Sequence, residues 1–267
     1  MKIAEIGWNF MGDMNLAETM IASAKKSGAS HVKFQFWKES SLKAGPWDAD
    51  GRREIYKSAQ LTEDRILQLN SCAKRYGLTP FYSVFTSDDI TYLAAFDLDL
   101  VKIPSHEIYN LDLISNAIKH FKTVIISTGA CRETELIDVA NLVASASNNI
   151  VIMHCVSSYP CDASKLNLPR LSHLQKLFPN ATLGLSDHTS STVLPSVAVA
   201  FGVDVIEKHF TVDNDLPGRD NKFALLPHQF AEMVVNFNEA KLGCQDLGIE
   251  FQESEADIVQ NYRGRWG

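Results

Sequence analysis

The chain has 267 residues, of which 45% are hydrophobic and 21% charged, and its formal net charge is −7. Such a chain can form one barrel or two small domains. Its acidic balance argues against a nucleic-acid partner, which usually meets a basic face. The N-terminus is typical of a strand rather than a signal peptide, and no apolar run could span a bilayer, so we expect a cytoplasmic protein with no membrane partner. Five cysteines without a Cys-x-x-Cys pair argue against a disulfide framework or a zinc knuckle.

Strands and helices are predicted to alternate through the first half of the chain. Apolar runs predict strands at 2–6, 31–37, 80–85 and 100–103, and helical spacing predicts helices at 15–28, 62–76, 88–96 and 111–120. Asn15, with Glu18 three residues later, is expected to cap the first helix, and Gly28 is expected to end it. The polar loop around residues 45–51 is long enough to be a lid.

The second half of the chain repeats this alternation of predicted strands and helices. Strands are predicted at 123–127, 150–155, 181–186 and 204–210, with helices at 133–144, 168–178, 193–201 and 227–242. Eight such units predict the α/β class, and within it a single-domain (β/α)8 TIM barrel over residues 1–243. A doubly wound open sheet is the alternative, but no Gly-x-Gly-x-x-Gly turn follows the first strand. Residues 244–267 are polar and are predicted to form a linker-like arm.

Polar residues gather where the predicted strands end, which is where barrel enzymes build their sites. Strands buried on both faces should be apolar, so ionisable residues inside them cost free energy unless they are paired or functional. A salt bridge could account for any one of them, but not for the whole set. The set comprises Glu5, Lys33, Gln35, Ser83, Lys102, Ser105, Glu107, Ser127, Thr128, His154, Ser157, Tyr159, Ser186, Asp187, His188, Glu207, Lys208 and His209.

The residue types in this set indicate an anionic substrate and a metal. Two lysines and several hydroxyls suit a phosphate together with a carboxylate. His188 and His209 are candidate ligands of a divalent ion, and Glu5 and Glu107 are candidates for proton transfer.

No residue stands out as a covalent nucleophile. Cys155 follows a strand, and its neighbour His154 is expected to point to the opposite side. A lysine in a barrel can also form a Schiff base, so Lys102 or Lys208 keeps that alternative open.

The motifs that contain these residues resemble the sialic acid synthase family over nearly the whole chain. The matching segments are Glu5-Ile-Gly-x-Asn9, Lys33-Phe-Gln35, Lys102-Ile-Pro-Ser105, Ser127-Thr-Gly129, His154-Cys-x-x-x-Tyr159-Pro160, Gly184-Leu-Ser-Asp-His-Thr189 and Glu207-Lys-His-Phe-Thr211. The resemblance implies a metal-dependent condensation of phosphoenolpyruvate with an open-chain N-acetylated hexose, such as N-acetylmannosamine, to give a nonulosonic acid and phosphate.

The resemblance also implies roles for individual residues. His188 and His209 would bind Mn²⁺, Mg²⁺ or Co²⁺, and Glu107 would handle water and its protons. The candidate catalytic residues are Glu5, Glu107, Glu207 and His209. The candidate phosphoenolpyruvate ligands are Lys33, Ser83, Lys102, Ser105, Ser127, Ser157 and Ser186. Gln35, Tyr159 and Asp220 would face the sugar.

Several positions depart from the family pattern. Phe10 stands where the family has His, Ser83 is followed by Val84 rather than Thr, Ser157 takes the place of an Asn, and Arg219 replaces a Pro. The sequence stops where the family's C-terminal antifreeze-like domain would begin, so a homodimer is expected to cover the open mouth.

Three other functions stay open on the sequence. A barrel synthase acting on a phosphorylated aldose would need further basic residues, and only Arg219 is a candidate. A Schiff-base lyase would use a barrel lysine. A non-catalytic relative would bind phosphoenolpyruvate without turnover.

Overall fold

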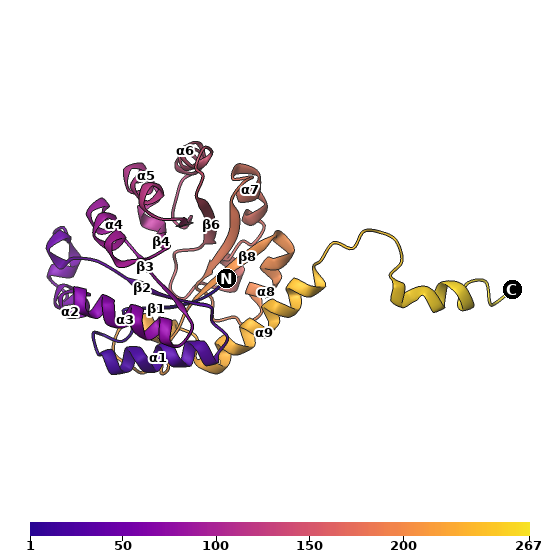
Figure 1. Cartoon of the computed structure of the whole chain (residues 1–267), viewed down its shortest axis with the longest axis horizontal. Coiled ribbons are helices and arrows are strands. Elements are labelled where there is room, and N and C mark those ends of the chain that lie inside the picture. The colour runs from indigo at the N-terminus through magenta and orange to yellow at the C-terminus, as the bar shows by residue number, and fades with distance from the viewer.

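In a computed structural model that describes residues 1–267, eight parallel strands close into one barrel in sequence order (Figure 1). The predicted (β/α)8 fold is therefore confirmed. The strands are β1 (Lys2–Gly7), β2 (His31–Gln35), β3 (Thr79–Ser83), β4 (Leu100–Ile103), β5 (Thr123–Ser127), β6 (Asn149–Cys155), β7 (Thr182–Asp187) and β8 (Val203–His209).

Helices surround the barrel, and most of them bury apolar side chains against the outward face of the strands. They are α1 (Met14–Lys26), α2 (Arg52–Ala59), α3 (Glu63–Arg75), α4 (Ser87–Leu93), α5 (Leu111–His120), α6 (Glu133–Val143), α7 (Arg170–Leu177), α8 (Leu194–Val197) and α9 (Pro227–Gly243). Two predicted helices are shorter than expected, because 88–96 and 193–201 each finish as a 3₁₀ turn.

The sequence prediction placed the first helix cap at the wrong residue. Asp13, not Asn15, caps α1, because its carboxylate accepts hydrogen bonds from the backbone N–H groups of Asn15 and Leu16 at 2.9 and 3.2 Å. The expected loop at 45–51 also lies within a more ordered segment. Two 3₁₀ turns and α2 fill this segment, where Arg53 pairs with Glu39 and Asp48.

Strand residues alternate between two environments. Outward-facing side chains join the core beneath the helices. Inward-facing side chains at the bottom of the barrel form a separate apolar cluster of Ile3, Phe81, Leu100, Ile125, Val151, Met153 and Val205. Residues two positions further along these strands also face inward, and there the barrel interior becomes polar.

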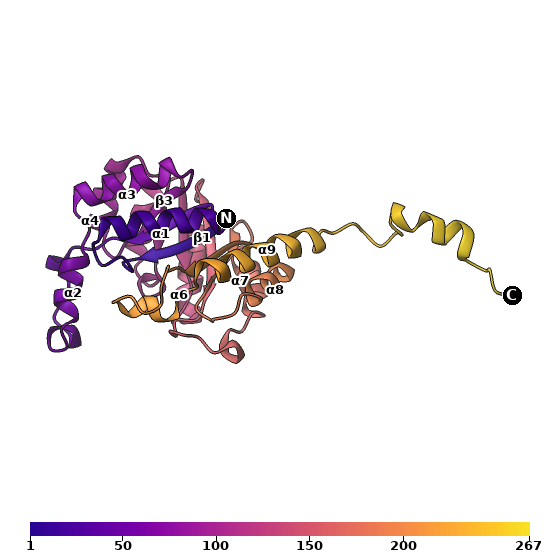
Figure 2. The ribbon, with the colours of Figure 1, turned by 90° about the horizontal axis from the view of Figure 1, so that it is seen from below.

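The α2 segment and the loops after β6 and β8 project from one side of the barrel (Figure 2). This side is the C-terminal end of the strands, where the polar interior opens. No helix is long and apolar enough to cross a membrane.

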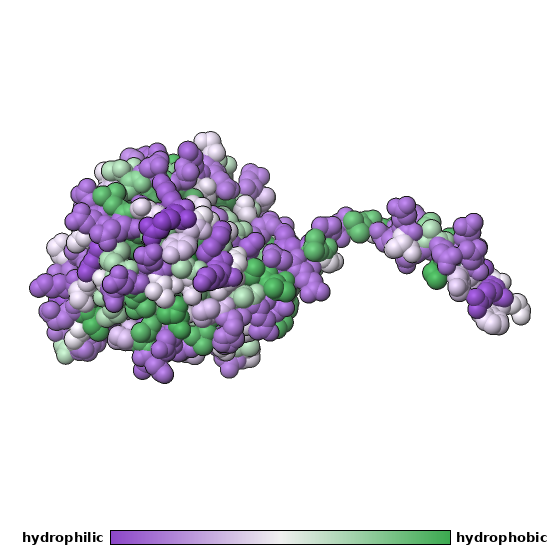
Figure 3. Space-filling view, turned by 60° about the horizontal axis from the view of Figure 1, so that its bottom comes forward, coloured by the Kyte–Doolittle hydropathy of each residue, from purple (hydrophilic) through white to green (hydrophobic).

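Residues 244–267 run away from the barrel (Figures 1 and 2) and contain two short helical turns, Glu253–Glu255 and Ile258–Tyr262. Ile249 and Trp266 on this segment are 99% and 86% exposed. Hydrophobic surface also gathers on the barrel beside the root of the segment (Figure 3), where Val235 and Leu242 of α9 are exposed.

Candidate active site

Four charged side chains, Glu5, Lys33, Lys102 and Glu207, form a layer inside the barrel, which we call the charged layer. Lys33 Nζ lies 3.0 Å from Glu5 Oε2 and 3.5 Å from Glu207 Oε1, and Lys102 Nζ lies 2.5 Å from Glu207 Oε1. None of the four side chains is more than 5% exposed. Gln35 Nε2 donates a hydrogen bond to Glu5 Oε1 at 2.9 Å. Opposite charges therefore compensate one another in a region without bulk water.

The two carboxyl groups of the charged layer differ in acidity. Burial alone would raise the pKa of Glu207, but the charges of Lys102 and Lys33 outweigh burial and lower this pKa to about 2. Burial raises the pKa of Glu5 more than Lys33 lowers it. Glu207 therefore stays ionised, and Glu5 is the weaker acid of the two.

Hydroxyl groups surround the charged layer. Ser83 Oγ accepts a hydrogen bond from Lys33 Nζ at 3.0 Å, and Ser186 Oγ donates to Glu207 Oε1 at 3.1 Å. Ser127 Oγ is buried and has no hydrogen-bond partner in the protein. A buried hydroxyl without a partner is costly, so Ser127 has a donor available for a ligand.

Gly129 brings two further hydroxyls together. Its N–H donates to Ser105 Oγ at 3.1 Å. A Cβ at this position would lie 2.4 Å from Ser157 Oγ, 2.8 Å from Ser105 Oγ and 3.1 Å from Cys155 Sγ. Only glycine leaves these three side chains in place, so the loop after β5 requires a glycine at position 129.

The two predicted metal ligands, His188 and His209, lie side by side with their ring centroids 5.4 Å apart. His188 Nδ1 donates to the carbonyl oxygen of Val156 at 2.8 Å, which assigns the proton to Nδ1 and leaves the Nε2 lone pair free. Burial lowers the pKa of His209 well below its usual range, so this ring is neutral, and its buried Nδ1 has no hydrogen-bond partner.

Two adjacent imidazoles, each with a ring nitrogen that makes no hydrogen bond within the protein, fit a divalent ion. No group of three or more His, Cys, Asp or Glu side chains is arranged to hold a metal. An ion bound by His188 and His209 would therefore take its other ligands from substrate and water, which is the open coordination that catalytic sites use.

Two of the three residues predicted to face a sugar, Tyr159 and Asp220, lie beside the histidines, whereas Gln35 bonds to Glu5 in the charged layer. The ring of Tyr159 is 4.1 Å from the His188 ring and 6.0 Å from the His209 ring, centroid to centroid. Asp220 Oδ2 lies 3.9 Å from His209 Nδ1 and accepts a hydrogen bond from Trp8 Nε1 at 3.2 Å. Burial raises the pKa of Asp220.

Glu107 stands apart from the other candidates. It ends the 3₁₀ turn after β4, and its ion-pair contact is with neighbouring His106, 3.9 Å away, not with the charged layer. Its side chain is 16% exposed, and burial raises its pKa. Glu107 is thus a rim residue, free of the interior ion pairs.

Three strand-end residues face away from the interior. His154 Nε2 bonds the carbonyl oxygen of Leu166 at 2.6 Å, which confirms the predicted direction of this side chain. Lys208 Nζ pairs with Asp187 Oδ2 at 2.8 Å on the outer side of β7 and β8. Lys208 alternates with the inward-facing Glu207 and His209, so it does not reach the barrel interior.

The aromatic residues at the mouth were not among the predicted site residues, although their positions indicate where they lie. Trp37 and Phe85 each stand two positions after an inward-facing residue, Gln35 and Ser83. Cys155 is a further residue for which the sequence predicted no role. Burial would raise the pKa of this thiol, but contact with His188 lowers it to about 7.

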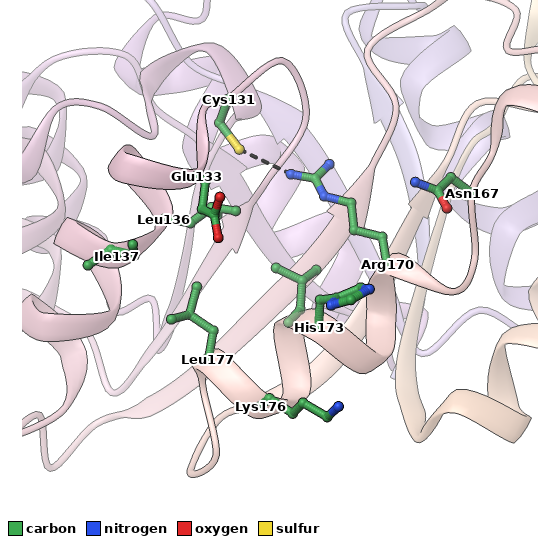
Figure 4. A pocket seen from close by; sticks show the side chains of 10 residues that line it. Cys131, Glu133, Leu136, Ile137, Asn167, Arg170, His173, Lys176 and Leu177 are labelled. Atoms are coloured by element: carbon green, nitrogen blue, oxygen red, sulfur yellow. Dashed lines mark hydrogen bonds between the residues drawn. The ribbon is translucent and has the colours of Figure 1, made fainter.

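A groove of about 730 Å³ lies on the outside of the barrel along α6 and α7 (Figure 4). Arg170 reaches across it, and its Nη2 donates to Cys131 Sγ at 3.2 Å. The groove contains none of the predicted site residues, so it is separate from the barrel mouth.

Comparison with known proteins gives one matching family. The model of the NeuB family matches residues 20–246. The chain is 32% identical to a pseudaminic acid synthase of Campylobacter jejuni, with 94% of this chain and 76% of that protein covered. It is also 32% identical to the N,N'-diacetyllegionaminic acid synthase of Legionella pneumophila, with 90% of this chain and 71% of that protein covered.

A solved structure of a similar protein also matches this chain. The N-acetylneuraminic acid synthetase of Leptospira borgpetersenii, solved with citrate, superposes with a TM-score of 0.90 at 28% identity. The match covers 97% of this chain and 89% of that one.

Proposed function

The chain belongs to the NeuB family, and on that premise we propose that it condenses phosphoenolpyruvate with the open-chain form of an N-acetylated hexose, giving a nonulosonic acid and phosphate. It is an enzyme, a phosphoenolpyruvate-condensing transferase like the acid synthases it matches. The observation that supports the proposal best is the charged layer with two imidazoles beside it at the C-terminal mouth of the barrel.

The charged layer and its hydroxyls would hold phosphoenolpyruvate. Lys33 and Lys102 supply cations, and Ser105, Ser127 and Ser186 supply donors for the phosphate and carboxylate oxygens. Such preorganised charge is usually the largest catalytic contribution, and losing one contact costs roughly 3 kcal/mol of barrier.

The reaction then proceeds by forming a carbon–carbon bond and a bond between carbon 2 and the oxygen of water, and by breaking the bond between carbon 2 and the phosphate oxygen. Carbon 3 of phosphoenolpyruvate attacks the aldehyde carbon, the aldehyde oxygen takes a proton, and carbon 2 becomes an oxocarbenium ion. Water adds to carbon 2 and gives up a proton, for which Glu107 at the rim is the candidate base. The bond between carbon 2 and the phosphate oxygen breaks, phosphate leaves with the electron pair and takes up the proton of the carbon 2 hydroxyl, and a ketone forms.

We propose His188 and His209 as the ligands of a divalent ion, Mn²⁺, Mg²⁺ or Co²⁺. When bound, such an ion supplies Lewis-acid polarisation of a carbonyl oxygen. The protein's own part is to keep the His209 ring neutral, which burial does, and to orient the His188 ring, which its hydrogen bond to the Val156 carbonyl does.

Isotope labelling tests the reaction directly. In water enriched in ¹⁸O, the proposed route gives phosphate without the label, because the added water attacks carbon 2 and not phosphorus. Mass spectrometry should also find a sugar acid that has gained the three carbons of phosphoenolpyruvate. Labelled phosphate would contradict the route, and binding of phosphoenolpyruvate without any product would indicate a non-catalytic relative.

The geometry of the site gives little support to the other candidate functions. A Schiff base on Lys208 is disfavoured because this lysine faces outward, and Lys102 is already bonded to Glu207. Reduction with borohydride in the presence of substrate would trap a Schiff base if one formed. The expected homodimer is also part of the proposal, and light scattering on the purified protein measures the oligomer mass.

A further inference from the structure

A buried ion pair on the outer side of β7 and β8 lies directly behind the two candidate metal ligands. Asp187 and Lys208 are register partners in the sheet, and their side chains are 1% and 2% exposed. The residues that follow them, His188 and His209, point into the barrel, because successive residues of a strand face opposite sides. The ion pair and the two histidines therefore lie on opposite faces of the same two strand ends.

Thr189 extends the ion pair into a network that we call the clamp, which consists of Asp187, Thr189 and Lys208. Thr189 N and Oγ1 donate to Asp187 Oδ1 and Oδ2 at 2.8 and 3.0 Å. Lys208 Nζ donates to the carbonyl oxygen of Thr189 and lies 3.3 Å from Thr189 Oγ1. His188 is the residue between Asp187 and Thr189. The clamp thus fixes the backbone on both sides of this histidine and ties it to β8.

The polar groups of the clamp are used up within the protein. Both carboxylate oxygens of Asp187 accept hydrogen bonds, and Lys208 Nζ has three acceptor atoms around it. Groups that face the barrel interior differ in this respect, because Ser127 Oγ and His209 Nδ1 are buried without a partner. The clamp therefore holds backbone in place and leaves the binding of ligands to the interior groups.

Backbone pairing alone does not decide how the ends of β7 and β8 are aligned. The register shifts near the bottom of the barrel, where Leu183 pairs with Val203 but Gly184 pairs with Val205. A slip of one residue would turn a side chain to the other face of the sheet. The ion pair lies beyond this shift and selects one alignment of the strand ends, the one in which both histidines face inward.

Stability alone is a weak explanation for the clamp. Taking two charges out of water is costly, and apolar residues can often replace a buried ion pair without loss of stability. A buried pair does favour one geometry, because any other alignment leaves a buried charge without a partner. The rings of His188 and His209 need a defined geometry, since their centroids lie 5.4 Å apart and one ion must reach both.

We propose that the clamp positions the two histidines for the divalent ion. Its residues set the separation and direction of the rings and touch neither the ion nor a substrate, so they are positioning residues. This inference rests on the proposed function, because it takes His188 and His209 as the ligands of the ion. Groups that support metal ligands from behind commonly contribute about 10-fold to 100-fold in metal affinity.

Binding of Mn²⁺ to the whole chain, without either substrate, tests the proposal. Electron paramagnetic resonance of the free ion gives the Kd. Lys208→Met removes the cation of the clamp and should raise this Kd about 10-fold to 100-fold. Thr189→Val keeps the shape of the side chain and the ion pair but removes the hydroxyl, and it should raise the Kd several-fold. Thr189→Ser, which restores the hydroxyl, should recover most of the wild-type affinity.

Two controls separate positioning from a general loss of structure. Lys241→Met breaks an ion pair with Asp204 at the opposite end of β8 and should leave the Kd unchanged. His209→Ala removes a ligand and gives the Kd of a disrupted site. Circular dichroism and urea denaturation show which variants are folded. If Lys208→Met does not fold, Thr189→Val carries the test.

The outcomes separate this inference from the proposed reaction. An unchanged Kd in folded Lys208→Met, or in folded Thr189→Val, overturns the role of the clamp and leaves the metal ligands standing. A wild type that binds Mn²⁺ no better than His209→Ala overturns the assignment of the ligands, and the role of the clamp with it. A chain that binds Mn²⁺ as expected but does not condense phosphoenolpyruvate contradicts the proposed reaction and not the clamp, because no substrate takes part in the binding measurement.

Discussion

Glu207 is the residue on which the charged layer depends, because its carboxylate lies within 2.5 Å of Lys102 and 3.5 Å of Lys33. All three side chains are buried, so neither lysine can turn to water if this carboxylate is removed. Breaking a buried ion pair by removing one partner commonly costs about 3–5 kcal/mol, since the remaining charge is left without compensation.

We predict that Glu207→Gln lowers the free energy of unfolding at pH 7 by about 3 kcal/mol. The pKa of Glu207 is about 2 in the folded protein and has an ordinary value of 4.5. Its stabilisation is thus present above pH 4.5 and is lost as the pH falls toward 2. Urea denaturation at pH 7 and pH 3 should show the difference between wild type and variant shrinking. Glu54→Gln, an exposed change on α2, is the control, and a difference independent of pH would contradict the assignment.

Replacing Glu107 should affect catalysis and not stability, because Glu107 takes no part in the interior ion pairs. Glu107→Gln should reduce kcat by about 10²-fold to 10⁴-fold if the carboxylate accepts the proton of the attacking water. Burial raises the pKa of Glu107, and a base must be deprotonated, so wild-type activity should fall as the pH drops through that raised pKa.

The measurement for Glu107 is a pH–rate profile together with thermal unfolding. The variant should lose the acidic limb of the profile while its Tm stays that of the wild type. Asp112→Asn, an exposed change at the start of the next helix, serves as the control. A variant with normal kcat would remove Glu107 from the mechanism.

How much of the site can be predicted from the sequence differs between residues. Charged residues in the middle of apolar strands identify Glu5, Lys33 and Glu207 as interior groups, because strand alternation decides their side. The pairing of Lys102 with Glu207 joins β4 to β8 across the barrel, so no local pattern indicates it. The contacts of Trp8 with Trp37 and Tyr56 likewise join loops that only the closed barrel brings together.

At the scale of elements, the loop after β5 is the most constrained part of the site. Gly129 has no room for a methyl group, because its Cβ would lie 2.4 Å from Ser157 Oγ. Separations below about 3 Å force a shift, and here the neighbours are the side chains proposed to bind the substrate.

Gly129→Ala should therefore raise the KM for phosphoenolpyruvate at least about tenfold, which corresponds to about 1.4 kcal/mol of lost binding. Gly243→Ala, at the end of α9, adds a methyl group with nothing within 4 Å and should change nothing. Steady-state kinetics on both variants compares them. A normal KM in Gly129→Ala would show that Ser105 and Ser157 do not contact phosphoenolpyruvate.

The sequence predicts the ends of a helix or strand correctly where the hydrophobic periodicity agrees with the residues that typically begin or end such an element. The bounds of β4, β5 and α5 are those that the sequence predicts. The first helix cap was missed because Asp13 and Asn15 are both good capping residues two positions apart, and only the backbone conformation of Asp13 decides between them. The predicted ends of β2 and β3 were too late, because apolar side chains beyond Gln35 and Ser83 pack at the mouth and not in the sheet.

At the scale of the whole molecule, residues 244–267 are the part with the least packing against the rest. We propose that they form an arm that the barrel does not need for stability. Limited proteolysis should cut first within 244–252, where the chain is exposed, and leave a barrel fragment with an unfolding midpoint within a few degrees of the uncut protein. Initial cleavage within the barrel, or a large loss of stability after cleavage in the arm, would contradict this.

We propose that the charged layer and the two histidines together carry out a sugar-dependent condensation. The most direct measurement is phosphate release from phosphoenolpyruvate with Mn²⁺, with and without N-acylated hexoses, repeated after chelation and with His209→Ala. We predict release that requires a hexose, stops on chelation and is lost in His209→Ala while the fold stays intact. Release without any hexose, or full activity in folded His209→Ala, would contradict the account.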